Sequence, residues 1–230
     1  MNLSCADGTD ALFRRSWARV AAAFGADSAA DGLRDDLLRR YAEPARHYHT
    51  RQHLAECLAA FEAHAALARH AAQVEAALWF HDAIYDPRGQ GNEAASAQLA
   101  REGLAAAGAS PAFAEEVARL VLVTMHDGVP AAPDEALLVD IDLAILGADG
   151  TRFDEYERQV RCEYAFVPDA AFYPARARIL RGFLARPRLY GTEALHARLE
   201  DQARHNLSRS IAAAGRAAPT TRRDARDDGD

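Results

Sequence analysis

Residues 46–53 read RHYHTRQH, residues 79–82 read WFHD, and residues 140–142 read DID. Each of these short segments groups side chains that can bind a metal ion. The runs between them are long enough to form helices, so we expect the three segments to belong to three helices that converge. The hypothesis is that two histidines and two aspartates from these helices meet on one divalent cation.

The length, composition and charge limit the classes of protein to which the chain can belong. The chain has 230 residues, of which 50% are hydrophobic and 27% are charged, and its formal net charge is -7. That length fits one domain or at most two, and the composition is typical of a globular protein with a sizeable core. The negative charge argues against nucleic acid as a main partner, because a phosphate backbone requires a concentrated basic face. Cys5, Cys57 and Cys162 are odd in number and widely spaced, which indicates reduced thiols.

No basic start followed by an apolar run is visible at the N-terminus, and no apolar run approaches the roughly 18 residues of a membrane span. We therefore expect a cytoplasmic protein without a membrane partner.

Apolar residues recur with a period near 3.6 along almost the whole chain, which predicts an all-α fold. Thr50 is expected to cap one helix, and Ser110 to cap another that has Pro111 at its first position. Pro174 is expected to begin a helix, and Thr192 to cap the last one.

A further helix is expected from Asp134 through Ile145, with Gly147 as its stop. Residues 1–212 contain no repeat and no clear linker, so we predict a single helical domain over that range. Residues 213–230 are rich in Ala, Pro, Thr, Arg and Asp, and we expect them to form a disordered tail.

Two polar pairs stand inside strongly apolar runs. His81 and Asp82 follow Leu-Trp-Phe, and Asp140 and Asp142 alternate with valine, isoleucine and leucine. Burying a carboxylate among such side chains is costly without a partner or a metal ion. Because Asp140 and Asp142 are two apart, they point to different sides of a helix, and we expect only one of them to be a ligand.

Histidines precede these pairs. His49 and His53 are four residues apart, so they would share one face if a helix began by His49. By residue pattern alone, the prediction is a buried polar site that holds a metal ion.

The ordered set of motifs resembles the HD superfamily of metal-dependent phosphohydrolases, and in particular a bacterial family of predicted HD-type phosphohydrolases. The Tyr-His-x-x-x-His segment is also similar to one in the cyclic-nucleotide phosphodiesterases, which have asparagine in place of Thr50. The motifs are RxYHTxxH from Arg46, FHDAxYD from Phe80, NExxSA from Asn92, DxDLxILG from Asp140 and RxEY from Arg161.

This resemblance implies a single-domain HD-type helical bundle whose metal site is built from residues 46–142. It implies His53, His81, Asp82 and Asp142 as the metal ligands. Asp142 is favoured over Asp140 because Asp-Leu-Ala resembles the Asp-Leu-Ser of the phosphodiesterases. It implies His49 as the residue that protonates the leaving oxygen.

A donor set of two imidazoles and two carboxylates suits one divalent ion of Mn, Fe, Co, Ni, Mg or Zn. Such an ion lowers the pKa of a water and polarises a phosphoryl oxygen. Glu56, Asp86 or Glu93 is expected to orient that water or accept its proton. Arg46, Arg161 and His126 are expected to bind the phosphate.

We therefore expect a hydrolase of a small phosphate ester, most simply a nucleotide or a nucleotide-like metabolite. One alternative is an HD-fold diiron oxygenase, which would need further ligands; between Asp82 and Asp142 the chain offers only His126. The other is a non-catalytic helical module that binds a nucleotide or a metal. A homodimer is compatible with the sequence, which does not fix the oligomeric state.

Overall fold

The computed structural model describes residues 3–26 and 30–217, and within them every regular element is a helix. The predicted all-α class is therefore confirmed. The elements are α1 (Leu3–Ala23), α2 (Asp31–Arg40), α3 (Arg51–His64), η2 (Ala65–Leu67), α4 (Ala71–Phe80), α5 (Asn92–Ala106), α6 (Pro111–Val123), α7 (Pro133–Asp142), η3 (Leu143–Gly147), α8 (Gly150–Glu163), α9 (Asp169–Leu184) and α10 (Glu193–Ala217).

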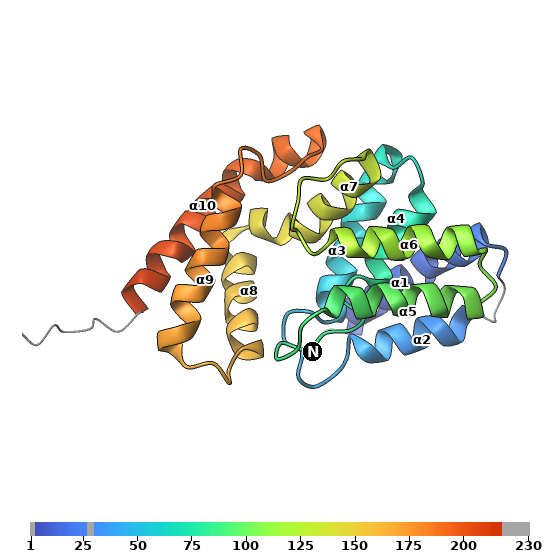
Figure 1. Ribbon diagram of the computed structural model, residues 1–230, viewed down its shortest axis with the longest axis horizontal. Helices are drawn as coiled ribbons and strands as arrows, with labels where there is room; N and C mark the ends of the chain where they lie inside the picture. The colour runs from blue at the N-terminus through green and yellow to red at the C-terminus, as the bar shows by residue number, and fades with distance from the viewer. Residues whose placement is uncertain (1–2, 27–29, 218–230) are drawn as a thin grey trace, which may run out of the picture.

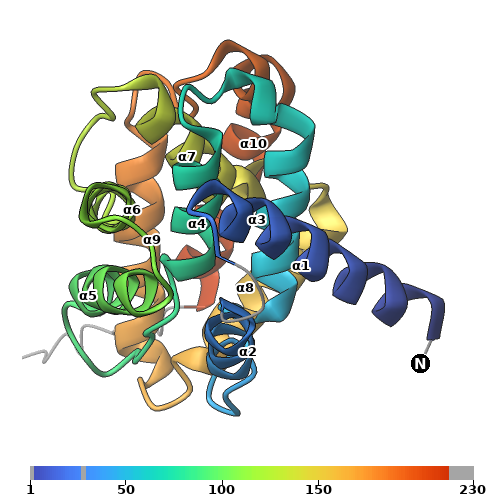
Figure 2. The ribbon, with the colours of Figure 1, turned by 90° about the vertical axis from the view of Figure 1, so that its right-hand side faces the viewer.

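The helices form two groups (Figure 1). The first group contains α1–α7, and the second contains α8–α10, with the short 3-10 helix η3 as the connection. Figure 2 shows α3, α4 and α7 together near the middle of the first group, with α5 and α6 side by side at its edge. None of the described helices combines the length and the apolar character that crossing a bilayer requires.

Helix α4 is the centre of the first group. It contacts α1, α3, α5, α6 and α7, and every residue from Val74 to Phe80 is buried. Trp79 packs edge-on against Trp17, and its indole N–H donates to Ser16 Oγ at 2.9 Å. The one charged residue in this stretch, Glu75, is paired with Arg19. Burial on all sides therefore holds the end of α4 in a fixed position within the core.

The predicted caps of α3 and α6 are confirmed. Thr50 accepts a hydrogen bond from the N–H of Gln52, and Ser110 accepts one from the N–H of Phe113, with Pro111 at the first helical position. Because α3 begins at Arg51, His49 precedes the helix. The condition under which His49 and His53 would share a helical face, a helix that begins by His49, is therefore not met.

The helix predicted to run through Ile145 changes character after Asp142. The chain continues as the 3-10 helix η3, which ends at Gly147 as expected. A side chain at Gly147 would have its Cβ 2.7 Å from Leu199 Cβ and 2.8 Å from the Leu199 carbonyl oxygen. This glycine therefore allows η3 to pack directly on α10.

Three expectations for the C-terminal helices need correction. Helix α9 begins at Asp169 and contains Pro174, whose missing N–H falls on an exposed position. Thr192 does precede α10, but its hydroxyl donates to Asp140 at 2.6 Å instead of capping the helix. Helix α10 continues to Ala217, so residues 213–217 are helical, and the rest of the expected disordered tail lies outside the described residues.

Candidate metal centre

Two histidines form the buried floor of the candidate site. His53 lies in the first turn of α3, and His81 directly follows the last residue of α4. Each is 1% exposed, and their Nε2 atoms lie 3.1 Å apart. The capped start of α3 and the buried end of α4 thus bring two imidazoles from different helices to one point.

Two carboxylates complete the group. Asp142 ends α7, and its Oδ1 lies 3.3 Å from His53 Nε2 and 3.4 Å from His81 Nε2. The Oδ2 of Asp82 lies 3.4 Å and 3.0 Å from the same two nitrogens. The carboxylate side chains are 13% and 19% exposed. The structure therefore brings all four predicted ligands together, with the histidines below and the carboxylates nearer to solvent.

These separations match the edges of a coordination shell. A divalent cation holds nitrogen and oxygen ligands at about 2.1 Å, which places neighbouring ligands about 3.0 Å apart in an octahedron and about 3.4 Å apart in a tetrahedron. The observed range from 3.0 Å to 3.4 Å fits both. The five separations that involve a histidine are therefore those of a site that could hold a metal ion.

The pKa values of the clustered side chains are strongly shifted by their neighbours. Burial alone would lower the pKa of His53, but the neighbouring Cys57, Tyr48 and carboxylates raise that pKa well above its ordinary value. Burial would raise the pKa of Asp142, but His81 and the other nearby imidazoles hold it well below the ordinary value. Buried charges of this kind are costly unless they are closely paired. Here the imidazoles and the carboxylates pair with one another, and a divalent cation would take the place of the imidazole protons in that pairing.

Cys57 lies beside this cluster, and sequence analysis assigns it no role there. The donor atoms of His53, Cys57, His81 and Asp142 all lie within 4.8 Å of one another. However, Cys57 Sγ is 3.7 Å from both Nδ1 and Nε2 of His53. A sulfur bound to a metal on Nε2 would lie clearly farther from Nδ1 than from Nε2, since the metal extends outward from the ring. The equal distances place the thiol against the side of the ring, so Asp82 is the better fourth donor.

Each floor histidine is oriented by a second hydrogen bond. His81 Nδ1 lies 2.8 Å from the Leu78 carbonyl oxygen, which can only accept, so Nδ1 carries the proton and Nε2 offers its lone pair to the cluster. His53 Nδ1 lies 3.0 Å from the Tyr48 hydroxyl. Such outer partners fix the tautomer and ring direction of metal-binding histidines. The orientation of the His53 and His81 rings therefore suits the binding of a metal cation.

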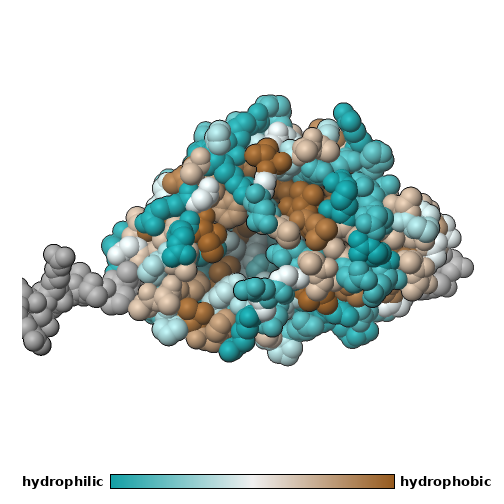
Figure 3. All heavy atoms as spheres, viewed as in Figure 1, coloured by the Kyte–Doolittle hydropathy of each residue, from teal (hydrophilic) through white to brown (hydrophobic). Residues whose placement is uncertain are grey.

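A cavity of about 360 Å³ opens above the carboxylates. It lies between the two groups of helices, where the space-filling view shows a hollow (Figure 3). Asp82 and Asp142 line it from the first group, and Tyr156, Val160 and Phe183 line it from the second. One wall thus carries the candidate metal centre and the other is largely aromatic and aliphatic, as in pockets for small organic ligands.

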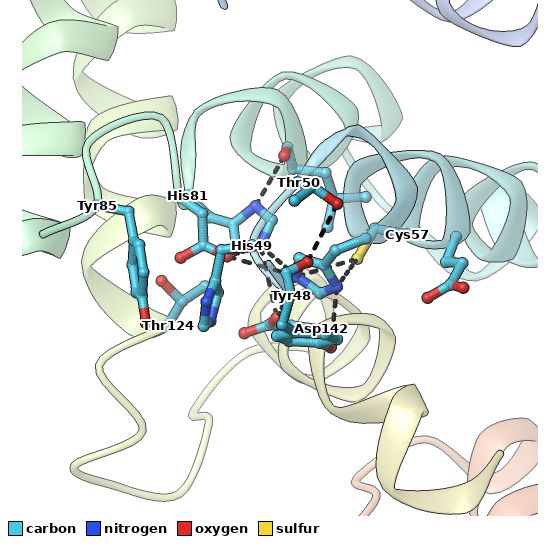
Figure 4. Close-up of polar contacts among 12 residues, drawn as sticks. Tyr48, His49, Thr50, Cys57, His81, Tyr85, Thr124 and Asp142 are labelled. Atoms are coloured by element: carbon cyan, nitrogen blue, oxygen red, sulfur yellow. Dashed lines mark hydrogen bonds and ion pairs between the residues drawn. The ribbon is translucent and has the colours of Figure 1, made fainter. Parts of the chain in front are cut away.

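His49 reaches this cavity from the segment before α3. Its Nδ1 lies 2.8 Å from Glu163 Oε2, and its ring stacks on Tyr85 with the centroids 4.0 Å apart. Figure 4 shows the His49 and Tyr85 rings lying side by side. Because the carboxylate accepts from Nδ1, the Nε2 atom of His49 is the one left for a ligand. This arrangement suits a histidine that transfers a proton.

Two other predicted residues line the same cavity, namely His126 and Glu93. His126 Nε2 lies 3.0 Å from Asp142 Oδ2, and its backbone has a φ of 58°, which is uncommon for a residue with a side chain. Glu93 lies in the first turn of α5. Both are placed where they could contact a bound ligand.

Arg46 lies elsewhere than expected. It is 5% exposed, and its guanidinium donates to the carbonyl oxygens of His49, Asp82 and Ala83 and to the carboxylate of Glu43. These contacts leave no free edge for a phosphate. Arg46 instead ties the His49 segment to the turn that carries Asp82, and its predicted role in substrate binding is corrected accordingly.

The remaining three predicted residues point away from the cluster. Glu56 makes a two-point ion pair with Arg152 at 2.7 Å and 2.9 Å. Asp86 is exposed and accepts from the N–H of Arg88 within its own loop. Arg161 donates to Asp169 and to backbone carbonyls after α8, beside a different cavity. Their predicted contributions to catalysis or substrate binding are not supported by these positions.

Sequence reasoning missed Glu163 and Arg176. Glu163 is 4% exposed and accepts from the N–H groups of His47, Tyr48 and His49 as well as from the His49 ring. It stands within the RxEY motif, so the motif offered a signal that was given no role. Arg176 lines the cavity from α9, and in a chain so rich in arginine nothing local marks it.

Searches against models of protein families, curated proteins and solved structures found no match to this chain. What can be said of its class rests on the fold and the site. The described chain is all-helical, and its buried cluster around His53, His81 and Asp142 could bind a metal ion, which is compatible with an HD-type fold.

Proposed function

We propose that this protein is a metal-dependent phosphohydrolase of the HD superfamily. Its substrate would be the phosphate ester of a nucleotide or a nucleotide-like metabolite. The observation that carries the proposal is the position of the four donor atoms. Each histidine nitrogen lies 3.0 Å to 3.4 Å from both carboxylates and 3.1 Å from the other histidine nitrogen, and the two carboxylates line a cavity of about 360 Å³.

His53, His81, Asp82 and Asp142 would hold one divalent ion. A shell of nitrogen and oxygen donors without thiolate suits Mn, Fe, Co, Ni, Mg or Zn. Held there, the ion supplies Lewis acidity toward a phosphoryl oxygen and lowers the pKa of a water.

The residues around the ion would have separate roles in the reaction. His49 would hold a proton at Nε2 for the leaving oxygen, with Glu163 fixing its orientation from the Nδ1 side. Glu93 reaches the cavity from α5 and could orient the attacking water. Tyr156, Val160 and Phe183 would exclude other water from the organic portion of the substrate.

Metal analysis combined with an activity screen tests this proposal. Protein purified without chelator is analysed for metal, and phosphate release from a library of phosphomonoesters and nucleotides is measured with Mn²⁺, Co²⁺ and Mg²⁺. His81→Ala should remove both the metal and the activity. His64→Ala is the matched control, because His64 lies at the end of α3 and bonds only to its own helix, through Ala60.

Three outcomes would contradict the proposal. Bound metal without phosphate release from any compound would favour a binding module. Two irons per chain with oxygen consumption would favour an oxygenase. Activity that survives in His81→Ala would show that the cluster is not the reaction centre.

A further inference from the structure

The two groups of helices differ in charge. Residues 150–217, which contain α8–α10, carry 12 arginines and 8 acidic residues, whereas residues 1–149 carry 12 arginines and 22 acidic residues. The second group is thus the positive part of a chain whose formal net charge is -7. A local excess of one charge favours ligands of the opposite charge. An anion that binds apart from the metal centre would therefore find its complement in the second group.

A second cavity lies within this positive group. It has a volume of about 500 Å³, and its lining residues come from α8, α9 and α10, the second group in Figure 1. Phe153, Phe172 and Tyr173 form its aromatic lining, and most of the surface that faces it is apolar. Of its lining residues, only Arg176 also lines the cavity above the metal centre. Its size and apolar walls are typical of a site for a small organic molecule.

The charged residues that line this second cavity have a net positive charge. They are two carboxylates and four arginines, namely Asp154, Glu157, Arg158, Arg161, Arg176 and Arg209. Three of the four arginines form ion pairs. Arg158 is exposed and forms no hydrogen bond or ion pair with any other described residue. The N–H donors of its guanidinium are therefore available to an anion in the cavity.

Arg209 is placed to act together with Arg158. Its Nη1 lies 2.6 Å from Asp154 Oδ1, but the two side chains are 41% and 46% exposed. Exposed ion pairs of this kind are weak, so an anion can compete for the arginine. The guanidinium carbon of Arg209 lies 5.7 Å from the centroid of the Phe153 ring. The cavity therefore offers a cation and an apolar surface side by side.

We propose that this second cavity binds a small organic anion, with Arg158 and Arg209 holding its phosphate, sulfonate or carboxylate group and the aromatic lining holding its apolar body. An inorganic anion alone would leave the apolar walls without a contact, so an amphipathic ligand fits better. The inference does not depend on the proposed function, because none of the four proposed metal ligands lines this cavity.

Titration of the protein with anilinonaphthalene sulfonate, a fluorescent aromatic anion, tests this proposal. We expect saturable binding, and we expect Arg158→Glu to weaken it about tenfold, because hydrogen bonds between charged groups are among the stronger ones. Arg178→Glu is the matched control. Arg178 is also exposed and has no partner among the described residues, but it does not line the cavity. This control makes the same change in net charge and should bind the probe as the original protein does.

A second variant tests the cavity itself. Ala213 is exposed and lies in the lining, so Ala213→Phe should fill part of the cavity and weaken probe binding at least about tenfold. Circular dichroism checks that both variants keep their helices. Equal probe affinity in Arg158→Glu, Arg178→Glu and the original protein would overturn the role of Arg158. Unchanged affinity in Ala213→Phe would place the probe elsewhere and overturn the site. Where Ala213→Phe does not fold, the comparison of the two arginine variants decides.

Displacement of the probe tests the need for an anionic group. Octanoate and octanol have carbon chains of equal length, but only octanoate carries a charge. Octanoate should displace the probe at concentrations at least about tenfold lower than octanol, because only its carboxylate can pair with the two arginines. Equal displacement by the two compounds would overturn the assignment of an anion to this cavity.

Discussion

The two groups of helices build the cavity in different ways. Helices α3, α4 and α7 end or begin at the site, and they supply His53, His81 and Asp142 from their terminal turns. Helix α8 supplies Glu163 from its last turn and α9 supplies Arg176 from its middle, and these two side chains bind or orient other groups instead of the metal. Binding of the metal therefore depends on the first group, and placement of the ligand depends on the second. Substitutions on the two sides should produce different kinds of defect.

The largest effect is expected where the first group meets the metal. Asp142→Asn should lower metal affinity by more than about 100-fold, because loss of a group that merely supports a ligand already costs 10- to 100-fold. The measurement is metal content after dialysis, together with a metal titration.

Asp140→Asn is the matched control. The carboxylate of Asp140 accepts from the N–H groups of Gly191 and Thr192 and from the Thr192 hydroxyl, and so secures the start of α10. This variant should keep its metal and lose about 1–3 kcal/mol of stability to urea, since an amide cannot satisfy all three donors. Equal metal loss in both variants would show that the two aspartates do not have separate functions.

A smaller effect is expected on the side of the second group, at Glu163. Burial would raise its pKa, but the His49 ring and the backbone N–H groups of His49 and His47 lower that pKa from 4.5 to about 2. The lowered pKa stabilises the fold fully above about pH 4.5, and this stabilisation is lost as the pH falls toward 2. Glu163→Gln should therefore be less stable at pH 7 by up to about 3 kcal/mol, and the difference should shrink as the pH falls through this window.

Urea unfolding of both proteins at pH 7 and pH 3 measures this change. Glu155→Gln, on the same helix but 41% exposed, is the control and should change stability by less than about 0.5 kcal/mol. Metal content should stay unchanged in Glu163→Gln. A stability difference that does not depend on pH would show that the carboxylate is not held ionised by His49.

The same contrast between the two groups explains how far the sequence could predict the site. Polar residues inside apolar runs must have a buried partner, so His81-Asp82 and Asp140-x-Asp142 could be recognised without a structure. The spacing of two residues also predicted that the aspartates would diverge. Asp142 does face the histidines, while Asp140 faces the start of α10.

The rest depended on contacts between distant segments. Periodicity shows which face of a helix is buried, but it does not show which other segment covers that face. Glu163 binds the backbone of residues 47–49 from more than a hundred positions away, and no local pattern encodes that contact. Arg46 was misassigned for a related reason. A long guanidinium beside a histidine motif can point to solvent or inward, and here three backbone carbonyls turn it inward.

The smallest effect is expected at Glu56, which lies on α3 with His53 but contacts the second group instead of the cavity. Its ion pair with Arg152 is 39% exposed on the carboxylate side, and exposed pairs typically contribute no more than about 1 kcal/mol. Glu56→Gln should therefore lower stability by less than about 1 kcal/mol and leave both metal content and phosphate release unchanged. Urea unfolding and the phosphate-release assay measure the two quantities on one preparation. A tenfold loss of activity with metal and fold intact would mean that a carboxylate turned away from the cavity still acts on the reaction. The assignment of metal binding to the first group of helices and of ligand placement to the second would then be wrong.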